Sequence, residues 1–354
     1  MTGAPVVSVI MAAYNGAELL PATLATLQKQ TFTDFEVIVV DDCSTDNTRE
    51  ILRAWPDQRV RLIALEQNGG PVRARNRALA QARGRYIAAL DQDDLCLPDR
   101  FARQVAYLDA HPGTVLLASA TEVFEGARVL PSPHVPHTTP GLLRWLIRIE
   151  NPIVWSSVML RTDAARRLEP FTRPDILYAE DFDLYHRMAA LGDIARLDTP
   201  LLAYRRHAGG ASQRYEDTML ASARRVLAGA YEPLLKEQAP VAAALVVGHL
   251  MHGLPVQDRA TLAALGDYLV HLQQAFLAER DWDAADIRMV RWVTARRWAE
   301  VSRRSLRAGT LTLPDALRVR PPHLGLGHAG LNDLIWARLI GRARAARQRY
   351  TFAA

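Results

Sequence analysis

Apolar runs and amphipathic stretches alternate along the first 110 residues of the chain. Four runs rich in valine, isoleucine and leucine have the length and composition of buried strands: residues 6–12, 36–40, 61–65 and 86–90. Leucines at helical spacing follow the first run, at Leu20, Leu24 and Leu27. Strands separated by helices of this length indicate a mostly parallel sheet covered by helices, which is an α/β fold.

The pattern changes to helices after Tyr215. We expect helices at about 215–237, 240–252, 258–280 and 283–308, then a link rich in proline and glycine at 321–327 and a last, basic helix from Leu331. The chain has 354 residues, which is long enough for two domains. We therefore predict an α/β domain over residues 1–215 and a helical C-terminal region with a basic tail over residues 216–354.

Acidic residues stand where two of the predicted strands end. Asp42 follows the second strand, and Asp91 and Asp93 follow the fourth. In an open α/β sheet, ligands bind outside the carboxyl ends of the strands, and two carboxylates one residue apart can hold a divalent cation. A loop whose aspartates cap the next helix is the alternative for Asp91 and Asp93 taken alone. Because Asp42 is expected at the same edge of the sheet as Asp91 and Asp93, the three residues together favour a binding site.

Two familiar phosphate-binding motifs are absent from the sequence. No G-x-G-x-x-G follows the first strand, where Ala13-Tyr-Asn-Gly16 stands, and no G-x-x-x-x-G-K-[ST] occurs anywhere. A nucleotide at the acidic edge would therefore need another partner for its diphosphate. A metal ion held by aspartates would neutralise that charge, which suits a reaction in which a nucleoside diphosphate is the leaving group.

The composition is that of an ordinary globular protein, with 49% hydrophobic residues. The longest apolar candidate for a membrane span, residues 240–251, is about half of the ~20 residues that a helix needs to cross a bilayer. Cys43 and Cys96 are the two cysteines, which argues against a disulfide framework. Because the N-terminus carries no basic and apolar leader pattern, we expect a cytoplasmic protein.

Positive charge is concentrated near the C-terminus. Residues 284–354 hold 14 arginines against four acidic residues, whereas the whole chain has a net charge of +5. The last helix combines apolar residues with arginines, which is typical of an amphipathic helix at a membrane interface. We expect contact with the cytosolic face of an anionic inner membrane and no nucleic-acid partner. A solvated arginine face on a helix packed against its own domain is the alternative.

Four motifs, in this order, resemble the successive signatures of the family 2 inverting glycosyltransferases, which have the GT-A fold. They are residues 7–16 (VSVIMAAYNG), 30–42 (QTFTDFEVIVVDD), 68–79 (NGGPVRARNRAL) and 90–94 (LDQDD). The resemblance covers about the first 215 residues. It implies that residues 1–215 form a GT-A catalytic domain that transfers a sugar from a nucleotide donor.

The resemblance also implies roles for individual residues. Tyr14 and Asp42 would contact the nucleobase and ribose of the donor, and Arg75 would lie near the base or the diphosphate. Asp91 would lie near the ribose and a divalent metal, Mn²⁺ or Mg²⁺. Asp93 would bind that metal directly.

A predicted helix that begins near Glu180 carries acids in its first turn. Capping is one explanation, because the helix dipole favours acids there. The resemblance implies instead that Asp181 is the general base. The chemistry calls for one, since an acceptor hydroxyl is a poor nucleophile until its proton is removed. Attack opposite the leaving nucleotide would then invert the anomeric carbon without a covalent intermediate.

A histidine follows at a third site. The segment from Leu202 to Ser212 resembles the family's Tyr-Arg-x-His segment, which implies that His207 acts at the diphosphate or the metal. A packed or surface histidine is the alternative.

The sequence thus leads to one main function and two alternatives. We predict a metal-dependent inverting glycosyltransferase of cell-envelope polysaccharide synthesis, which moves a sugar from a nucleotide donor, expected to be a UDP-sugar, to a glycan or lipid-linked acceptor. A sugar nucleotidyltransferase would need a glycine-rich, lysine-containing loop near the N-terminus, which the sequence lacks. A non-catalytic nucleotide-binding scaffold would have no reason to retain Asp91, Asp93 and Asp181. The oligomeric state is left open.

Overall fold

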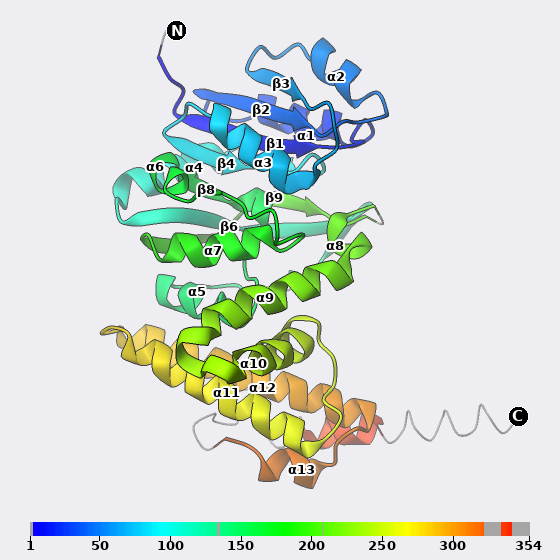
Figure 1. The fold of residues 1–354 in the computed structure, drawn as a ribbon, viewed down its shortest axis with the longest axis vertical. Helices are drawn as coiled ribbons and strands as arrows, with labels where there is room; N and C mark the ends of the chain where they lie inside the picture. Colours follow the sequence, from blue (N-terminus) through cyan, green and yellow to red (C-terminus); the bar gives the residue numbers. More distant parts are fainter. Residues whose placement is uncertain (1–2, 133–134, 208, 322–333, 342–354) are drawn as a thin grey trace, which may run out of the picture. The chain divides into compact units, whose positions relative to one another are not determined.

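The computed structural model describes residues 3–132, 135–207, 209–321 and 334–341 (Figure 1). Within these residues the chain divides into two compact units. The first takes in residues 1–143 and 151–222, and the second takes in residues 144–150 and 223–354. The predicted boundary after residue 215 stays a prediction. The assignment of residues 144–150 to the second unit is a feature that the hydrophobic pattern does not reveal.

The first unit is built on a mixed sheet. Among the described residues nine strands pair in the order β3-β2-β1-β4-β8-β6-β9-β5, with β7 beside β6 (Figure 1). Their bounds are β1 (Val7–Ala13), β2 (Phe35–Asp41), β3 (Val60–Ala64), β4 (Tyr86–Ala89), β5 (Leu95–Cys96), β6 (Thr114–Glu125), β7 (Arg128–Leu130), β8 (Met159–Arg161) and β9 (Asp193–Arg205). Strands β1 to β4 pair in parallel, whereas β8 runs antiparallel to both β4 and β6. The predicted α/β fold is confirmed.

Helices lie between the strands of this sheet along the chain. They are α1 (Leu20–Gln28), α2 (Thr48–Ala54), α3 (Gly70–Gln81), α4 (Arg100–Ala110), α5 (Pro140–Leu146), α6 (Thr162–Arg166) and α7 (Glu180–Ala189), and α8 (Ala211–Arg214) follows the last strand. Helix α1 follows the first strand, as the leucine spacing predicts, and buries Leu20, Leu24 and Leu27. Its first turn contains a proline, which is tolerated at this position.

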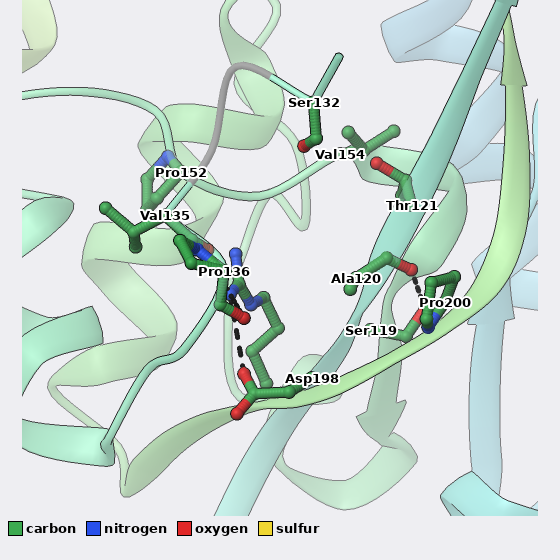
Figure 2. Close-up of a pocket in the computed structure, with 11 residues that line it drawn as sticks. Ser119, Ala120, Thr121, Ser132, Val135, Pro136, Pro152, Val154, Asp198 and Pro200 are labelled. Carbon is green, nitrogen blue, oxygen red and sulfur yellow. Dashed lines mark hydrogen bonds and ion pairs between the residues drawn. The ribbon is translucent and has the colours of Figure 1, made fainter. Parts of the chain in front are cut away.

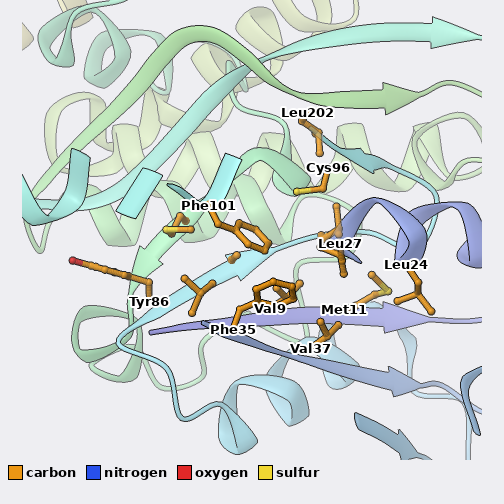
Figure 3. Close-up of a cluster of buried hydrophobic side chains, with 14 of the residues drawn as sticks. Val9, Met11, Leu24, Leu27, Phe35, Val37, Tyr86, Cys96, Phe101 and Leu202 are labelled. Atoms are coloured by element: carbon orange, nitrogen blue, oxygen red, sulfur yellow. The ribbon is translucent and has the colours of Figure 1, made fainter. Parts of the chain in front are cut away.

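The core of the first unit surrounds β1. Every residue from Val7 to Met11 is buried, as expected of a central parallel strand that is covered on both faces. On one face Val9 and Met11 lie in a cluster with side chains of α1 and α4 (Figure 3). In this cluster Phe35 meets Phe101 edge to face, with ring centroids 5.2 Å apart. The carboxyl end of β1 is therefore held rigidly.

A buried arginine fixes the end of β4. Arg100 of α4 is fully buried, and its Nη2 donates to the carbonyls of Ala89 at 2.9 Å and Val158 at 3.0 Å. Its Nε donates to Gln104 Oε1 at 3.0 Å. Burial lowers the pKa of Arg100, but these acceptors compensate for part of the lost hydration. Because Ala89 stands just before the acidic segment that follows β4, α4 helps to set the position of that segment.

The second unit is helical. Helix α9 (Glu216–Leu235) begins in the first unit and continues into the second from Ala223. The elements after it are a 3₁₀ turn (Lys236–Gln238), α10 (Ala239–Val246), a π-helical turn (Val247–Met251), α11 (Arg259–Ala278), α12 (Ala284–Ala308) and α13 (Leu313–Arg318). These bounds agree with the predicted helices to within a few residues. Asp258 and Asp283 cap α11 and α12, because each carboxylate accepts a backbone N–H of the first turn at 2.7 Å. Gly309, with φ of 77°, ends α12 in the left-handed conformation that glycine favours.

Residues 144–150 join the second unit through ion pairs. Arg148 pairs with Glu279 at 2.6 Å, and Glu150 pairs with Arg297 at 2.6 Å. The Glu150 and Arg297 side chains are 13% and 17% exposed, so water screens this pair weakly.

The last described helix covers residues 334–341 and buries Leu334 and Ala337. The rest of the predicted basic helix, and most of the link before it, lie outside the described residues. No helix in the described part of the chain combines the length and the apolar character needed to cross a membrane.

Candidate active site

The acidic residues singled out in the sequence lie at one edge of the sheet. Strands β1, β2 and β4 are adjacent and parallel, so their carboxyl ends share this edge. Asp42 follows β2, and its N–H donates to the carbonyl of Ala13, the last residue of β1, at 2.8 Å. Asp91 follows β4, and its N–H donates to Ser156 Oγ at 3.0 Å. The fold therefore brings Asp42 and the Asp91 segment to neighbouring positions.

Gln92 connects the loops that follow β1 and β4. Its side-chain amide accepts from the Tyr14 N–H and donates to the Tyr14 carbonyl, both at 3.0 Å. A Cβ on Gly16 would lie 2.3 Å from Gln92 Oε1, so a larger residue at this position would displace the Gln92 side chain. Tyr14 itself is 46% exposed and thus accessible to a ligand. Sequence reasoning gave Gln92 no role, because a side chain that pairs with a distant backbone leaves no local pattern.

Asp42 is buried and fixes the start of α3. Its Oδ1 accepts from the Gly69 N–H at 2.8 Å, and its Oδ2 accepts from the Gly70 N–H at 2.7 Å. Gly70 has φ of 80°, a conformation that other residues rarely adopt. The predicted contact of Asp42 with a donor stays a prediction. The observed role of Asp42 is to orient the helix that carries Arg75.

Arg75 joins the acidic edge to the helix that carries Asp181. Its Nη2 donates to Asp91 Oδ1 at 3.0 Å, and its Nη1 donates to Glu180 Oε1 at the start of α7. The guanidinium also lies over the Trp155 ring, 4.6 Å from the ring centroid. The Arg75 and Glu180 side chains are only 10% and 4% exposed, so their attraction is weakly screened by water. One buried cation thus connects three segments that are distant in sequence.

Three carboxylates crowd together beside Arg75. Among the described residues, Asp91, Asp93 and Asp94 offer oxygens that all lie within 4.8 Å of one another. Burial, together with the charges of the neighbouring aspartates, raises the pKa of Asp93 and raises that of Asp94 more strongly. His207 adds a nitrogen, because its Nε2 lies 2.8 Å from Asp93 Oδ2.

This set of groups fits a divalent cation. Carboxylate oxygens are the ligands that Mg²⁺ and Mn²⁺ prefer, and a cation would relieve the repulsion among the aspartates. Asp94 Oδ2 is buried and has no hydrogen-bond partner in the described part of the chain. The Arg205 N–H donates to Asp94 Oδ1 at 2.9 Å, so the end of β9 holds the cluster from the other side. Asp94 belongs to the motif at residues 90–94, but the sequence pattern predicts no separate role for it.

Asp181 lies in the first turn of α7. Its Oδ2 accepts from Asn151 Nδ2 at 3.1 Å, and its Oδ1 accepts from the Phe182 N–H at 2.7 Å. Burial and the negative charge of Glu180 raise the pKa of Asp181 to about 6, although the Asn151 hydrogen bond and the charge of Arg75 act in the opposite direction. A carboxylate with this pKa is ionised at neutral pH and is a better proton acceptor than an ordinary aspartate.

Strained backbone surrounds these residues. Asn15, Cys43 and Tyr178 all have positive φ, at 48°, 64° and 60°. Such conformations persist where the surroundings fix them, and they concentrate at functional sites. Tyr178, three residues before Asp181, stacks on Tyr215 with ring centroids 4.2 Å apart.

Comparison with known proteins agrees with this fold. The crystal structure of S. aureus TarS 1–349 in complex with UDP-GlcNAc matches 95% of this chain and 91% of that chain, with a TM-score of 0.54 and 20% identity. At this identity the likeness shows the fold, which is that of the GT-A nucleotide-diphospho-sugar transferases.

The sequence comparisons identify the family. The model described as "Glycosyl transferase family 2" matches residues 8–167. The putative glycosyltransferase EpsE of Bacillus subtilis (strain 168) is 34% identical over 200 residues, which are 53% of this chain and 68% of that protein. The succinoglycan biosynthesis protein ExoO of Rhizobium meliloti (strain 1021) is 47% identical over 106 residues, which span 30% of its length. The chain belongs to glycosyl transferase family 2.

The buried ion pairs of Arg75 have a measurable consequence for stability. We expect Arg75→Met to lower the free energy of unfolding by about 3–5 kcal/mol, because Glu180 would keep a buried charge without a partner. Adding Glu180→Gln should recover part of this loss. Chemical denaturation of both single variants and the double variant gives the coupling energy.

Arg77→Met is the matched control, since Arg77 lies on the same helix but is exposed. We expect its effect to stay within about 0.5 kcal/mol. Equal losses for Arg75→Met and Arg77→Met would contradict the role of Arg75 as a buried link.

Proposed function

We propose that this family 2 protein is an inverting glycosyltransferase that moves a sugar from a nucleoside-diphosphate donor to a glycan or lipid-linked acceptor. One observation carries the proposal. Arg75 connects a cluster of aspartates suited to a metal ion with Glu180, and the next residue of the same helix is Asp181, a carboxylate whose pKa is raised to about 6. The UDP-GlcNAc in the TarS complex supports a UDP-sugar as the donor, and the naming of ExoO for succinoglycan biosynthesis supports a polysaccharide product.

The donor would bind at the acidic edge of the sheet. Asp91, Asp93 and His207 would hold a divalent cation, which when bound neutralises the diphosphate and the charge that grows on it as it leaves. We assign Tyr14, which is accessible beside these residues, and the neighbouring Asp42 to the nucleoside of the donor.

The acceptor would react beside Asp181. The carboxylate of Asp181 takes the proton of the acceptor hydroxyl while the hydroxyl oxygen bonds to the anomeric carbon. The bond from that carbon to the diphosphate oxygen breaks, and its electron pair leaves with the nucleoside diphosphate. Because the attack comes from the opposite side, the anomeric configuration inverts in one step. Asn151 orients the carboxylate, and the ion pair of Arg75 with Glu180 fixes the helix that carries it.

Substitution of Asp181 distinguishes a role in the transfer reaction from a role in donor binding. We expect Asp181→Asn to lower the transfer rate about 10²–10⁴-fold, because the amide cannot accept the proton. Metal-dependent binding of UDP should remain within a few-fold of the wild type, as measured by calorimetric titration. Equal loss of transfer and of UDP binding would count against a base role.

The raised pKa of Asp181 sets the pH dependence of transfer. Asp181 acts only when ionised, so we expect kcat/KM to fall as the pH drops below about 6. Asn151→Ala should move this limb to higher pH, because it removes a hydrogen bond that lowers the pKa of Asp181. Glu180→Gln should move it to lower pH, because it removes a charge that raises that pKa. If the fall in kcat/KM occurs at the same pH in both variants, it is caused by the titration of a group other than Asp181.

Metal-dependent donor binding can be detected by thermal stability. We expect UDP with Mn²⁺ to stabilise the folded protein by about 2.7 kcal/mol at a free UDP concentration 100 times Kd. Asp93→Asn should abolish this gain, whereas Asp34→Asn, at an exposed position, should preserve it. The same measurement with UDP-, GDP-, CMP- and dTDP-sugars identifies the nucleobase of the donor. If none of these sugar nucleotides stabilises the protein even with Mn²⁺, the proposed assignment of the donor site is contradicted.

We also propose that the C-terminal region binds an anionic membrane surface at the cytosolic face. The helix at 334–341 exposes one apolar side, with Trp336 64% and Leu339 48% exposed, while Leu334 on its other side is buried. Residues 284–354 carry 14 arginines against four acids, which complements anionic lipid. An aromatic and aliphatic face beside arginines is typical of an interfacial helix.

Vesicle flotation tests this membrane contact. We expect the full chain to float with vesicles that contain phosphatidylglycerol and much less with vesicles of phosphatidylcholine alone. Trp336→Ser combined with Leu339→Ser should lower the bound fraction several-fold, whereas Leu317→Ser, at an exposed leucine of α13, should leave it unchanged. If the double serine variant binds vesicles as well as the wild type does, the helix at 334–341 is not part of the membrane interface.

A further inference from the structure

A pocket apart from the acidic edge lies in the first unit. Its volume is about 360 Å³, which is within the range of small-molecule sites. Strands β6 and β9 form one wall and residues 152–154 contribute to another, with Ser132, Val135 and Pro136 completing the lining (Figure 2). None of the residues assigned above to the donor, the metal or the base lines this pocket.

An irregularity in the pairing of β6 with β9 shapes the pocket. Ser119 pairs with Leu197, but the next residue, Ala120, pairs with Pro200. Between these two pairs β6 advances by one residue, whereas β9 advances by three. The extra residues of β9 form a β-bulge. Pro200 is tolerated there because the bulge needs no hydrogen bond from its nitrogen. As a result Ala120, Asp198 and Pro200 all contribute to the lining (Figure 2).

Two buried polar groups of the lining have no hydrogen-bond partner in the described part of the chain. They are Arg196 Nε and Thr121 Oγ1. The Arg196 side chain is 3% exposed, and Thr121 is 6% exposed. Buried polar groups are rarely left unpaired, because an unpaired donor or acceptor has lost its hydrogen bonds to water without replacement. A ligand that accepts from Arg196 Nε and bonds the Thr121 hydroxyl would satisfy both.

The other groups of the lining favour an uncharged ligand rich in hydroxyls. Arg196 Nη2 donates to the carbonyls of Val135 and Pro136 and lies 3.5 Å from Asp198 Oδ1, so the arginine charge is already balanced. A free anion would meet repulsion from Asp198, whereas a sugar hydroxyl could donate to it. The prolines and valines offer apolar surface to the C–H faces of a sugar ring.

One short segment, residues 151–155, contributes to the pocket and also contacts the candidate base Asp181 and Arg75. Pro152 of the pocket follows Asn151, whose side chain donates to Asp181 at 3.1 Å. Val154 of the pocket precedes Trp155, whose ring lies against Arg75. Residues 151–155 therefore contribute to both the pocket and the candidate active site.

We propose that this pocket binds a sugar unit of the acceptor glycan, remote from the hydroxyl that reacts at Asp181. The inference rests on the proposed glycosyltransferase function and extends it, because it makes the enzyme recognise more than the terminal sugar. Thr121 and Arg196 would then select the acceptor without taking part in the chemistry.

The test uses disaccharides as probes of the full chain. Saturation-transfer NMR titrations with cellobiose, lactose, N,N′-diacetylchitobiose and α-1,2-mannobiose measure Kd for the wild type and three variants. We expect at least one disaccharide to bind, and Thr121→Val to weaken it about five-fold, the effect of one lost hydrogen bond. Ala120→Leu, which fills the pocket, should abolish binding. Thr114→Val is the matched control at the far end of the same strand and should bind as the wild type does.

The release of UDP from UDP-sugars without acceptor, measured on the same preparations, separates this inference from the proposed function. We expect all three variants to keep wild-type UDP release. The inference is overturned if no disaccharide binds, if Thr121→Val and Thr114→Val behave alike, or if inorganic phosphate competes with the disaccharide. Wild-type protein that neither binds UDP with Mn²⁺ nor releases it from UDP-sugars would instead overturn the proposed function.

Discussion

The contact on which the site depends is the buried guanidinium of Arg75 between Asp91 and Glu180. A buried cation is tolerated only with carboxylate partners, and buried carboxylates need the cation equally. This mutual dependence fixes the helix that carries Asp181 against the segment that carries the aspartate cluster. The consequence is chemical as well as structural. The charges of Arg75 and Glu180 act on Asp181 in opposite directions, and together with burial they leave its pKa at about 6.

The remainder of the first unit supports this arrangement. Arg100 fixes the end of β4 through backbone carbonyls, and Gln92 ties the loop after β4 to the loop after β1. Asp42 orients the start of α3, and Arg75 lies one turn further on. Arg100, Gln92 and Asp42 all form hydrogen bonds to backbone atoms, which are less free to move than side chains. The strained conformation of Asn15 persists because its N–H donates to Ser44 Oγ and its side-chain oxygen accepts from the Thr45 N–H.

Much of this could be predicted from local patterns in the sequence. Buried strands and amphipathic helices have periods that are visible in single segments, so the α/β alternation, the strand ends and the helices after residue 215 were within reach. The parallel pairing of β1, β2 and β4 then brings Asp42 to the same edge as Asp91. The four ordered motifs indicated the family, since their order and spacing are more specific than any one of them.

The features that could not be predicted depend on contacts between distant segments. The amide of Gln92 and the carboxylate of Asp94 look like ordinary loop residues until their partners are known. The return of residues 144–150 to the helical unit rests on ion pairs with residues more than a hundred positions away. The pocket at Thr121 and Arg196 depends on a bulge between two strands, and a change of strand register leaves no periodic signal.

A crystal structure of the protein with Mn²⁺ and a non-hydrolysable UDP-sugar, with the metal located by its anomalous scattering, would test the donor site and the base together. We expect an anomalous peak bonded to Asp93, with the diphosphate on that metal and the anomeric carbon facing the Asp181 carboxylate across the space for an acceptor hydroxyl. A metal bound away from the aspartate cluster, or an anomeric carbon turned away from Asp181, would contradict these assignments.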